Sequence, residues 1–276
     1  MRIVRDVAAV RAAVASSGRV GLVPTMGAFH EGHLSLIRAA RASCDLVVVW
    51  LFVNPTQFNE AADLVAYPRD EDRDARLAEA CGADILFAPA VEAVYPPGFA
   101  TTVTVSGVAD VLEGALRPGH FAGVATVVAK MLNMVRPDIA FFGAKDAQQV
   151  AVVRRLVADL DIPTRIEVLP IVREEDGLAM SSRNVRLDPH ERRRATALHR
   201  GLVAAQSAVA AGERDPGLLA RAVADVLADA GIEAEYVAVV DPDSFLPVET
   251  LDRPTLIALA ARVGSTRLID NIEVAP

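Results

Sequence analysis

Two histidines, His30 and His33, stand three residues apart in the stretch VGLVPTMGAFHEGH, which begins at Val20. An apolar run ends at Pro24, and a short segment containing Gly27 separates that run from the histidines. Three-residue spacing places both imidazoles on one side of the first turn of a helix. Because N–H groups at a helix start attract anions, the pattern is typical of a phosphate site with two titratable donors. The alternative is a pair of ordinary surface histidines at a helix start.

The segment FFGAKDAQQ contains a second set of residues suited to an anionic ligand. Lys145 follows Gly143 closely and can reach a phosphate as a point charge, while Asp146 can either orient it or face the ligand shell of a metal ion. Gln148 and Gln149 each offer a donor and an acceptor for the hydroxyl groups of a small ligand, and we expect one of them to face inward. In isolation, the Lys–Asp pair is also typical of an ordinary surface.

A third polar segment follows DGLA and reads Met180-Ser181-Ser182-Arg183. Two hydroxyls and a guanidinium in succession indicate a mobile anion clamp, although such a sequence also occurs in ordinary loops. The chain lacks G-x-x-x-x-G-K-[ST] and G-x-G-x-x-G, which argues against a P-loop enzyme and a dinucleotide dehydrogenase.

Other polar residues are interpreted as structural. The acidic run at residues 70–74 favours a solvent-facing helix surface over a metal site. His120 is predicted to be a turn histidine, and His190 and His199 to lie at the surface. No local pattern indicates a Ser–His–Asp triad or a cysteine nucleophile.

The composition excludes several classes of protein. The chain has 276 residues, a net charge of −8 and a pI near 5.2, which argues against nucleic-acid and membrane-surface binding. Cys44 and Cys81 match no zinc or C-x-x-C spacing and are typical of a reducing compartment. We find no signal peptide and no apolar run near the ~20 residues that a bilayer requires. We therefore expect a soluble cytoplasmic protein.

The elements that must position these residues alternate between strand and helix. Strands are predicted at residues 19–23, 45–53, 85–87, 139–142 and 165–169, with helices between them and a short edge strand at 101–107. This alternation predicts a Rossmann-like, doubly wound parallel sheet, in which ligands bind beyond the carboxyl ends of the strands.

The character of the sequence changes in its last third. Two Ala/Arg-rich helices are predicted at 189–211 and 215–230, followed by strands at 234–240, 255–263 and 266–274. We therefore predict an α/β domain at residues 1–176 and a smaller α+β domain at 177–276, which carries the MSSR segment at its start.

Several motifs in one order identify a resemblance. PTMGAFHEGH, FVNPTQF, Tyr-Pro-Arg at 67–69, LEGALRPGHFAGV, FGAKDAQQ, DGLAMSSRN and the later RLIDN resemble the pantothenate synthetase family, the AMP-forming pantoate–β-alanine ligases. That family belongs to the HIGH-motif nucleotidyltransferases, and HEGH at 30–33 resembles their signature. MSSR stands where relatives carry a KMSKS-like loop.

The resemblance implies a two-step ligation with ATP and Mg²⁺. Pantoate attacks the α-phosphorus of ATP to give pantoyl adenylate, and β-alanine then displaces AMP. It also implies a homodimer, whereas the expectation of no nucleic-acid or membrane partner rests on the charge and composition. Donors around the phosphates would offset the developing negative charge, and positioning would supply much of the rate.

The resemblance also implies which residues form the site. His33, His30 and Lys145 are the catalytic candidates, with His33 as the family's proton donor. The ATP-binding candidates are Met26, Gly27, Ala28, Phe29, His30, Glu31, Gly32, His33, Gly143, Ala144, Lys145, Asp146, Val172, Met180, Ser181, Ser182 and Arg183. The substrate-binding candidates are Gln57, Gln149, Asn54 and Arg117.

Two positions depart from the family pattern: Ala144 stands in the Glu position of the usual Gly-Glu-Lys-Asp, and Ala147 replaces a commonly aromatic residue. The first departure is the one that matters for the site. If the site uses the backbone of residue 144, ATP binding survives, whereas a need for the carboxylate would weaken it. Two alternatives therefore stay open: another HIGH-motif nucleotidyltransferase that stops at an adenylylated product, and a catalytically weakened nucleotide-binding relative. The acidic charge disfavours a tRNA-charging enzyme.

Overall fold

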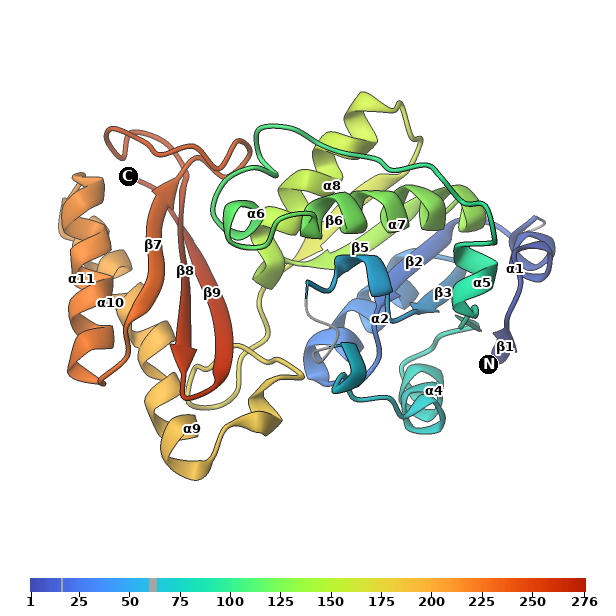
Figure 1. The fold of residues 1–276 in the computed structure, drawn as a ribbon, viewed down its shortest axis with the longest axis horizontal. Helices are drawn as coiled ribbons and strands as arrows, with labels where there is room; N and C mark the ends of the chain where they lie inside the picture. Colours follow the sequence, from blue (N-terminus) through green and yellow to red (C-terminus); the bar gives the residue numbers. More distant parts are fainter. Residues whose placement is uncertain (16, 60–63) are drawn as a thin grey trace. The chain divides into compact units, whose positions relative to one another are not determined.

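A computed structural model describes residues 1–15, 17–59 and 64–276, which form two compact units (Figure 1). The first unit comprises residues 1–144 and 152–170, and the second comprises residues 145–151 and 171–276. The first unit ends at residue 170, a few residues before the domain boundary predicted between residues 176 and 177. The division into domains at that boundary stays a prediction.

The first unit is built on a six-stranded sheet in the order β1-β4-β3-β2-β5-β6, with all pairings parallel. Its strands are β1 (Arg2–Val4), β2 (Val20–Thr25), β3 (Leu46–Leu51), β4 (Ile85–Phe87), β5 (Ile139–Gly143) and β6 (Arg165–Leu169). Its helices are α1 (Val7–Val14), α2 (Glu31–Ser43), α4 (Glu71–Ala80), α5 (Val91–Val94), α6 (Glu113–Leu116) and α7 (His120–Val135), with a 3-10 turn η1 (Pro55–Gln57). The 3-10 turn η2 (Ala144–Asp146) and helix α8 (Ala147–Asp159) each contain residues of both units. The predicted doubly wound parallel sheet is confirmed.

Burial on both faces of the sheet explains its continuous apolar strands. Val47 and Val49 of β3 join a core that includes Ile37 of α2 and Ala78 of α4. Their neighbour Val48 points to the opposite face and is also 0% exposed. An alternating polar pattern would leave one face open to water, whereas here both faces are covered.

Two predictions for the first unit are wrong. Residues 101–107 alternate like a strand but pair with no strand in the described parts of the chain; Val103 N instead donates to Thr126 Oγ1 of α7 at 2.9 Å. Strand β2 continues through Pro24 to Thr25. Proline is tolerated there because the β2–β5 ladder has already ended at Leu22, so no bond on that side is lost.

The second unit contains a three-stranded antiparallel sheet in the order β7-β8-β9. Its elements are η3 (Asn184–Arg186), α9 (Pro189–Ala195), α10 (Ala197–Ala210), α11 (Pro216–Asp229), β7 (Ala234–Val240), β8 (Thr255–Val263) and β9 (Thr266–Val274). Leu198 of α10 and Leu219 of α11 pack with Ile257 and Leu259 of β8 in one core. The predicted α+β unit and all three of its strands are confirmed.

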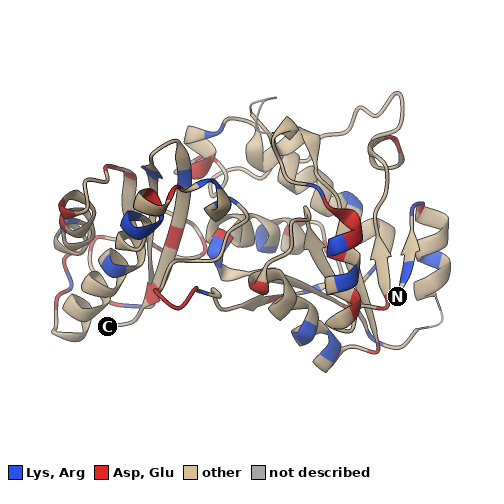
Figure 2. Cartoon of the chain, turned by 90° about the horizontal axis from the view of Figure 1, so that it is seen from below, with Lys and Arg blue, Asp and Glu red and all other residues tan. Residues whose placement is uncertain are grey.

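The charged side chains are mixed along the elements, with Lys and Arg among Asp and Glu (Figure 2). Both cysteines are free thiols, Cys44 being buried and Cys81 half-buried. Among the described helices, none combines the length and apolarity needed to cross a bilayer.

Candidate active site

The strand order places a polar segment where the chain reverses direction across the sheet. Strands β2, β3 and β4 follow one another toward one edge, and β5 and β6 continue from β2 toward the other. In such sheets, ligands bind beyond the carboxyl ends of the strands at the reversal. The β2–β5 ladder ends at the pair Leu22 and Ala140, while β2 stays paired with β3 up to Thr25. The segment from Met26 therefore leaves the sheet at the reversal point.

His30 is the N-cap of α2, and both histidines bind the first turn of that helix. His30 Nδ1 accepts a hydrogen bond from Gly32 N at 3.2 Å, and His33 Nδ1 accepts one from His30 N at 3.4 Å. The two ring centroids lie 4.2 Å apart. A Cβ on Gly32 would lie 2.9 Å from His30 Cε1, so glycine is what lets the ring fold over the turn.

These contacts determine which nitrogen of each imidazole carries the proton. A backbone N–H can only donate, so the Nδ1 atom that faces it accepts, and a neutral ring then has its hydrogen on Nε2. The N–H groups of His30 and Gly32 are therefore bound by the rings. The donors that His30 and His33 can offer a phosphate are their Nε2–H groups rather than those backbone groups.

Asp74 of α4 shapes the loop before these histidines. Its Oδ2 accepts from Ala28 N at 2.7 Å and its Oδ1 from Phe29 N at 2.8 Å. Gly27 and Ala28 have φ values of 90° and 54°, so a left-handed turn presents its N–H groups to this carboxylate. Burial raises the pKa of Asp74, although the two N–H bonds act against that rise. The prediction that residues 70–74 face solvent is wrong for Asp74, which is 1% exposed.

Two predicted ATP-binding residues have side chains engaged elsewhere. Phe29 is 1% exposed and belongs to the core between the sheet and α2. Glu31 forms an exposed ion pair with Arg38 on the same helix. The N–H of Phe29 is also bound, by Asp74, so neither the side chain nor the N–H group of Phe29 is directed at a ligand.

Asn54 holds Gln57 at the carboxyl end of β3. Asn54 is 1% exposed, and its Nδ2 donates to Gln57 Oε1 and to Gly123 O, both at 3.2 Å. Its Oδ1 accepts from Tyr95 Oη at 2.8 Å. Gln57 Nε2 lies 2.9 Å from Met26 Sδ, so three predicted site residues meet within the first unit.

Arg117 and His120 hold the main chain of the same glutamine. Arg117 Nη2 donates to Gln57 O at 3.4 Å, and His120 Nδ1 lies 2.8 Å from the same oxygen. Because a carbonyl only accepts, His120 Nδ1 carries the proton, and its Nε2 accepts from Arg117 Nη1 at 3.2 Å. His120 is 8% exposed, which agrees with a structural turn histidine.

Lys145 and the paired glutamines lie in the second unit. The carbonyl of Lys145 accepts a hydrogen bond from Asn271 Nδ2 of β9 at 2.9 Å. Gln148 is 4% exposed and is the inward-facing member of the pair, whereas Gln149 is half-buried and Asp146 is exposed.

A tight hairpin precedes the MSSR segment. Met180 N donates to Val172 O at 3.0 Å, and Gly177 turns the chain with a φ of 91°. Ser181 Oγ then accepts from Arg183 N at 3.2 Å, which starts the turn into η3. The hydroxyls and the guanidinium therefore directly follow a hydrogen-bonded hairpin, and the mobility expected of the clamp stays a prediction.

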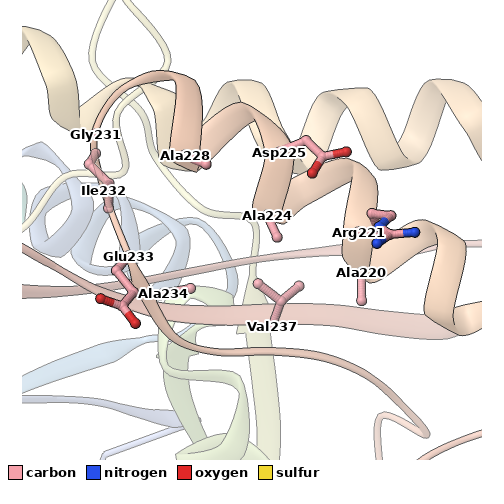
Figure 3. Close-up of a pocket in the computed structure, with 10 residues that line it drawn as sticks. All are labelled: Ala220, Arg221, Ala224, Asp225, Ala228, Gly231, Ile232, Glu233, Ala234 and Val237. Carbon is pink, nitrogen blue, oxygen red and sulfur yellow. The ribbon is translucent and has the colours of Figure 1, made fainter.

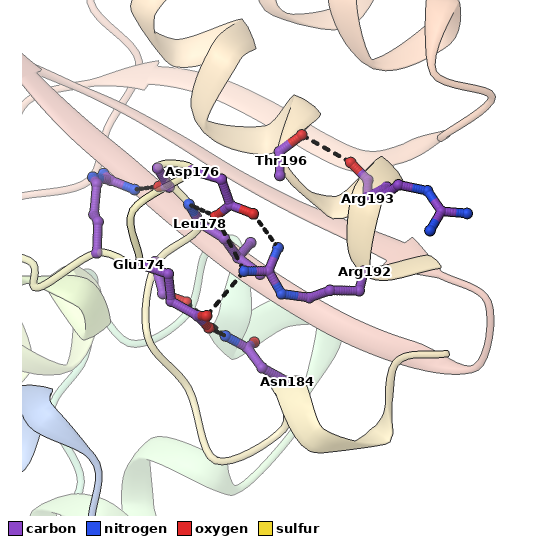
Figure 4. Close-up of polar contacts among 10 residues, drawn as sticks. Glu174, Asp176, Leu178, Asn184, Arg192, Arg193 and Thr196 are labelled. Carbon is purple, nitrogen blue, oxygen red and sulfur yellow. Dashed lines mark hydrogen bonds and ion pairs between the residues drawn. The ribbon is translucent and has the colours of Figure 1, made fainter. Parts of the chain in front are cut away.

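Arg192 of α9 binds two of the three acidic residues of this hairpin, Glu174 and Asp176 (Figure 4). Its Nη1 donates to Asp176 Oδ2 at 2.7 Å and its Nη2 to Glu174 Oε2 at 2.9 Å. Asn184 Nδ2 donates to Glu174 Oε1 at 2.9 Å, so the hairpin before the MSSR segment is joined to the residue that follows it. The bond from Arg192 lowers the pKa of Asp176.

His199 was predicted to lie at the surface, and the residue is half-buried, so that prediction is correct only in part. Its Nδ1 is buried with no hydrogen-bond partner in the described structure. A Cβ on Gly177 would lie 2.3 Å from His199 Cδ2, so the ring packs directly on the hairpin. Burial lowers the pKa of His199, the charge of Arg173 lowers it further, and Asp270 opposes both.

The structure thus joins two sets of predicted residues: Met26, Asn54, Gln57 and Arg117 in the first unit, and Val172 and Met180 in the second. Sequence reasoning missed three residues that bind predicted site residues: Asp74, Tyr95 and Asn271. Asn271 could have been found from the sequence, because it lies in the RLIDN motif at 267–271. Nothing in the local sequence distinguishes Asp74 from its acidic neighbours. Among the described residues, no group of three His, Cys, Asp or Glu could hold a metal ion.

A groove of about 720 Å³ between α11 and β7 contains none of the predicted site residues (Figure 3). Small side chains such as Ala220 and Ala224 line it together with Val237, and Arg221 and Asp225 stand on α11 at its edge. It lacks the convergent donors of an anion site, so we do not assign the chemistry to it.

Comparisons with known proteins point to one family. The sequence matches the family Pantoate-beta-alanine ligase over residues 2–273. It is 54% identical over 273 residues to pantothenate synthetase of Deinococcus radiodurans, covering 96% of this chain and 97% of that protein. It is 56% identical over 277 residues to pantothenate synthetase of Cereibacter sphaeroides, covering 99% of each.

Solved structures agree with the sequence comparison. Pantothenate synthetase from Thermus thermophilus superposes with a TM-score of 0.96 at 46% identity, covering 100% of both chains. Pantoate-beta-alanine ligase from Francisella tularensis, solved with Beta-gamma ATP and β-alanine, gives a TM-score of 0.83 at 33% identity, covering 99% of this chain and 97% of that one.

Proposed function

This chain belongs to the pantoate–β-alanine ligase family, and we propose that it joins pantoate to β-alanine to form pantothenate, using ATP and releasing AMP and pyrophosphate. The observation that supports this proposal best is the geometry of His30 and His33 at the start of α2. Each accepts a backbone N–H on Nδ1 and so directs a donor from Nε2.

The reaction proceeds in two displacements. A carboxylate oxygen of pantoate attacks the α-phosphorus, an acyl–phosphate bond forms, and the bond to the β-phosphate breaks with loss of pyrophosphate. The amine of β-alanine then attacks the acyl carbon and loses a proton, while the C–O bond breaks and AMP departs with the former carboxylate oxygen. No side chain becomes covalently attached, so the protein acts by positioning and by donating to the phosphates.

The residues divide into two groups of donors. His30 and His33 donate from the first unit to the phosphates, with His33 as the proton donor. Lys145, Ser181, Ser182 and Arg183 supply charge and hydroxyl donors to the phosphates. The remaining proposed ATP contacts are Met26–Gly32, Gly143, Ala144, Asp146, Val172 and Met180. Gln57 and Gln149 bind pantoate. Asn54 and Arg117 serve the substrate through Gln57, because their side chains already bind that residue.

Mg²⁺ enters this proposal with the nucleotide. Magnesium in nucleotide sites commonly takes its ligands from phosphate oxygens, waters and one or two carboxylates. We therefore propose that Mg²⁺ would be bound together with the triphosphate. When bound, the ion would neutralise charge on the leaving pyrophosphate.

The choice between an active ligase and the alternative functions depends on Ala144. The turn η2 forms with alanine at this position, so the fold of the segment needs no carboxylate there. We propose that residue 144 serves ATP through its backbone and that the enzyme is active. A nucleotidyltransferase that stops at an adenylylated product, or a weakened relative, is the competing outcome.

We further propose that the protein acts in the cytoplasm as a homodimer. Two free thiols suit a reducing compartment, and the dimer rests on the family resemblance. Light scattering on the purified chain would show twice the mass of 29.3 kDa if the second proposal is correct.

The test of the function supplies ATP, pantoate, β-alanine and Mg²⁺ and follows AMP and pantothenate together. Pantoate alone should support ATP–pyrophosphate exchange, which isolates the first displacement. His33→Ala should lower mainly kcat, and Gln149→Ala should raise mainly the KM for pantoate. Exchange without pantothenate formation would favour the adenylylated-product alternative, and a folded protein without exchange would favour the weakened relative.

A further inference from the structure

Strand β9 binds two separate segments to which the proposed function assigns ATP contacts. Asp270 and Asn271 are 2% and 6% exposed, although both are polar and lie in the middle of the strand. Polar side chains this buried require partners, and each of these has one outside its own hairpin. Asn271 binds the Lys145 segment, and Asp270 binds the segment that leads to Met180.

The first partner is the backbone of Lys145. Asn271 Nδ2 donates to Lys145 O at 2.9 Å, across 126 positions of sequence. Lys145 occupies the middle of the three-residue turn η2. Fixing a carbonyl in so short a turn fixes the peptide plane next to the Cα of Lys145, and with it the direction in which its side chain leaves the chain.

The second partner is the guanidinium of Arg173. It donates from Nη1 to Asp270 Oδ2 at 2.7 Å and from Nη2 to Asp270 Oδ1 at 3.0 Å, a two-point contact that leaves little rotational freedom. Nη2 also donates to Asn271 O at 3.3 Å, and Nη1 to Gly177 O at 3.1 Å. Arg173 thus joins the turn of the hairpin before Met180 to the two strand residues.

We propose that Asn271 is a positioning residue for the adenylation step and acts through Lys145. The Arg173–Asp270 pair fixes the position of the Met180–Arg183 segment relative to the same strand. This inference rests on the proposed function, because it assumes that Lys145 contacts ATP. Its consequence is that β9 sets the spacing between the lysine and the hydroxyl and guanidinium donors, all of which lie in the second unit.

A structural role and a positioning role predict different magnitudes. One buried hydrogen bond contributes about 1 kcal/mol to folding, so its loss leaves a protein of this size folded. Misplacing a catalytic group by about 1 Å costs on the order of 100-fold in rate. A positioning residue therefore loses far more kcat than thermal stability, and the loss depends on the presence of the residue that it positions.

The test uses Asn271→Asp, which keeps the shape of the side chain and replaces the Nδ2 donor by an oxygen facing Lys145 O. Pantoate-dependent ATP–pyrophosphate exchange should fall about 10- to 100-fold in kcat, with a much smaller change in KM. Asn271→Ser introduces a smaller side chain and should show the same loss of kcat. It replaces the aspartate variant in the test if that variant does not fold. Asn133→Asp is the control at an exposed site. Asn133 Nδ2 also donates to a carbonyl, Ala129 O, at 2.8 Å, and this variant should retain full activity.

The decisive measurement adds Asn271→Ser to Lys145→Ala. If the amide acts through Lys145, the double variant has the residual rate of Lys145→Ala alone, within about twofold. Multiplied losses, or an unchanged kcat in the folded Asn271→Ser protein, would overturn the proposal. A wild-type chain without exchange would instead overturn the proposed function, so the two failures are distinct.

Discussion

Asp74 Oδ2 binds the backbone N–H of Ala28 at 2.7 Å, although 46 positions separate the two residues. The contact connects a helix at one edge of the α/β unit to the turn that precedes His30. Without an acceptor at this place, two N–H groups in a largely buried left-handed turn would remain unpaired, at a cost of about 1–3 kcal/mol each. The geometry of the histidine pair therefore depends on a carboxylate outside the motif.

Replacing Asp74 by Asn should disturb the turn, because the amide keeps one acceptor and turns an NH₂ group toward the other N–H. We expect the free energy of unfolding to fall by about 1–3 kcal/mol and kcat to fall at least about tenfold. Urea unfolding and exchange kinetics measure the two effects. Asp72→Asn, at an exposed position of the same helix, is the control, and equal behaviour of the two variants would refute the assigned role.

Gly32→Ala separates helix stability from histidine geometry. Alanine in a helix is favoured over glycine by about 1 kcal/mol, yet a Cβ here would push against the His30 ring at 2.9 Å. We expect an unchanged or higher Tm together with a loss of kcat of about tenfold or more. Gly217→Ala, at the same position of α11, should retain activity. Full activity in Gly32→Ala would show that the ring position is not required.

Arg192→Met tests whether the hairpin must be clamped. The guanidinium joins Glu174 and Asp176 at the base of the MSSR segment but is partly open to solvent, so we expect a loss of about 1 kcal/mol. The apparent KM for ATP should rise about three- to tenfold, measured by initial rates. Arg193→Met removes an exposed neighbour of the same charge. A similar rise in both variants would assign the effect to net charge instead.

His199 should make stability depend on pH. Burial holds its folded-state pKa below the ordinary value of about 6.5, so the unfolded chain binds the proton first on acidification. The stability contributed by the neutral ring is fully present above about pH 6.5 and is lost as the pH falls through the folded-state pKa. His199→Gln should therefore flatten the fall of Tm between about pH 7 and pH 5. His190→Gln, at an exposed site, should leave the wild-type profile, and identical profiles for all three proteins would count against this reading.

Periodicity predicted most of the fold, because apolar runs and turn residues act locally. Strands β4, β6 and the three strands of the second unit match their predicted bounds. The three-residue strand β1 was missed, since it is recognisable only from its pairing with β4. Residues 101–107 show the converse error, an alternating pattern that is bound by α7 in place of a sheet.

The sequence predicted which residues could bind the ligand, but not the hydrogen bonds that hold those residues in place. Residue types and spacing indicated His30, His33 and Lys145 as donors. Asp74 acts on this loop through Phe29, 45 positions away, and Asn271 binds Lys145 across 126 positions. Their roles arise from tertiary contacts that no local pattern encodes. The same reason explains His199, whose burial depends on a hairpin more than twenty residues earlier.

The central claim is that the pantoate carboxylate attacks the α-phosphorus of ATP. Pantoate labelled with ¹⁸O in its carboxylate should be incubated with the enzyme, ATP, Mg²⁺ and β-alanine, and the AMP analysed by mass spectrometry. The mechanism predicts one ¹⁸O atom in the phosphate of each AMP, formed in step with pantothenate. Unlabelled AMP, or label appearing in inorganic phosphate alongside ADP, would contradict it.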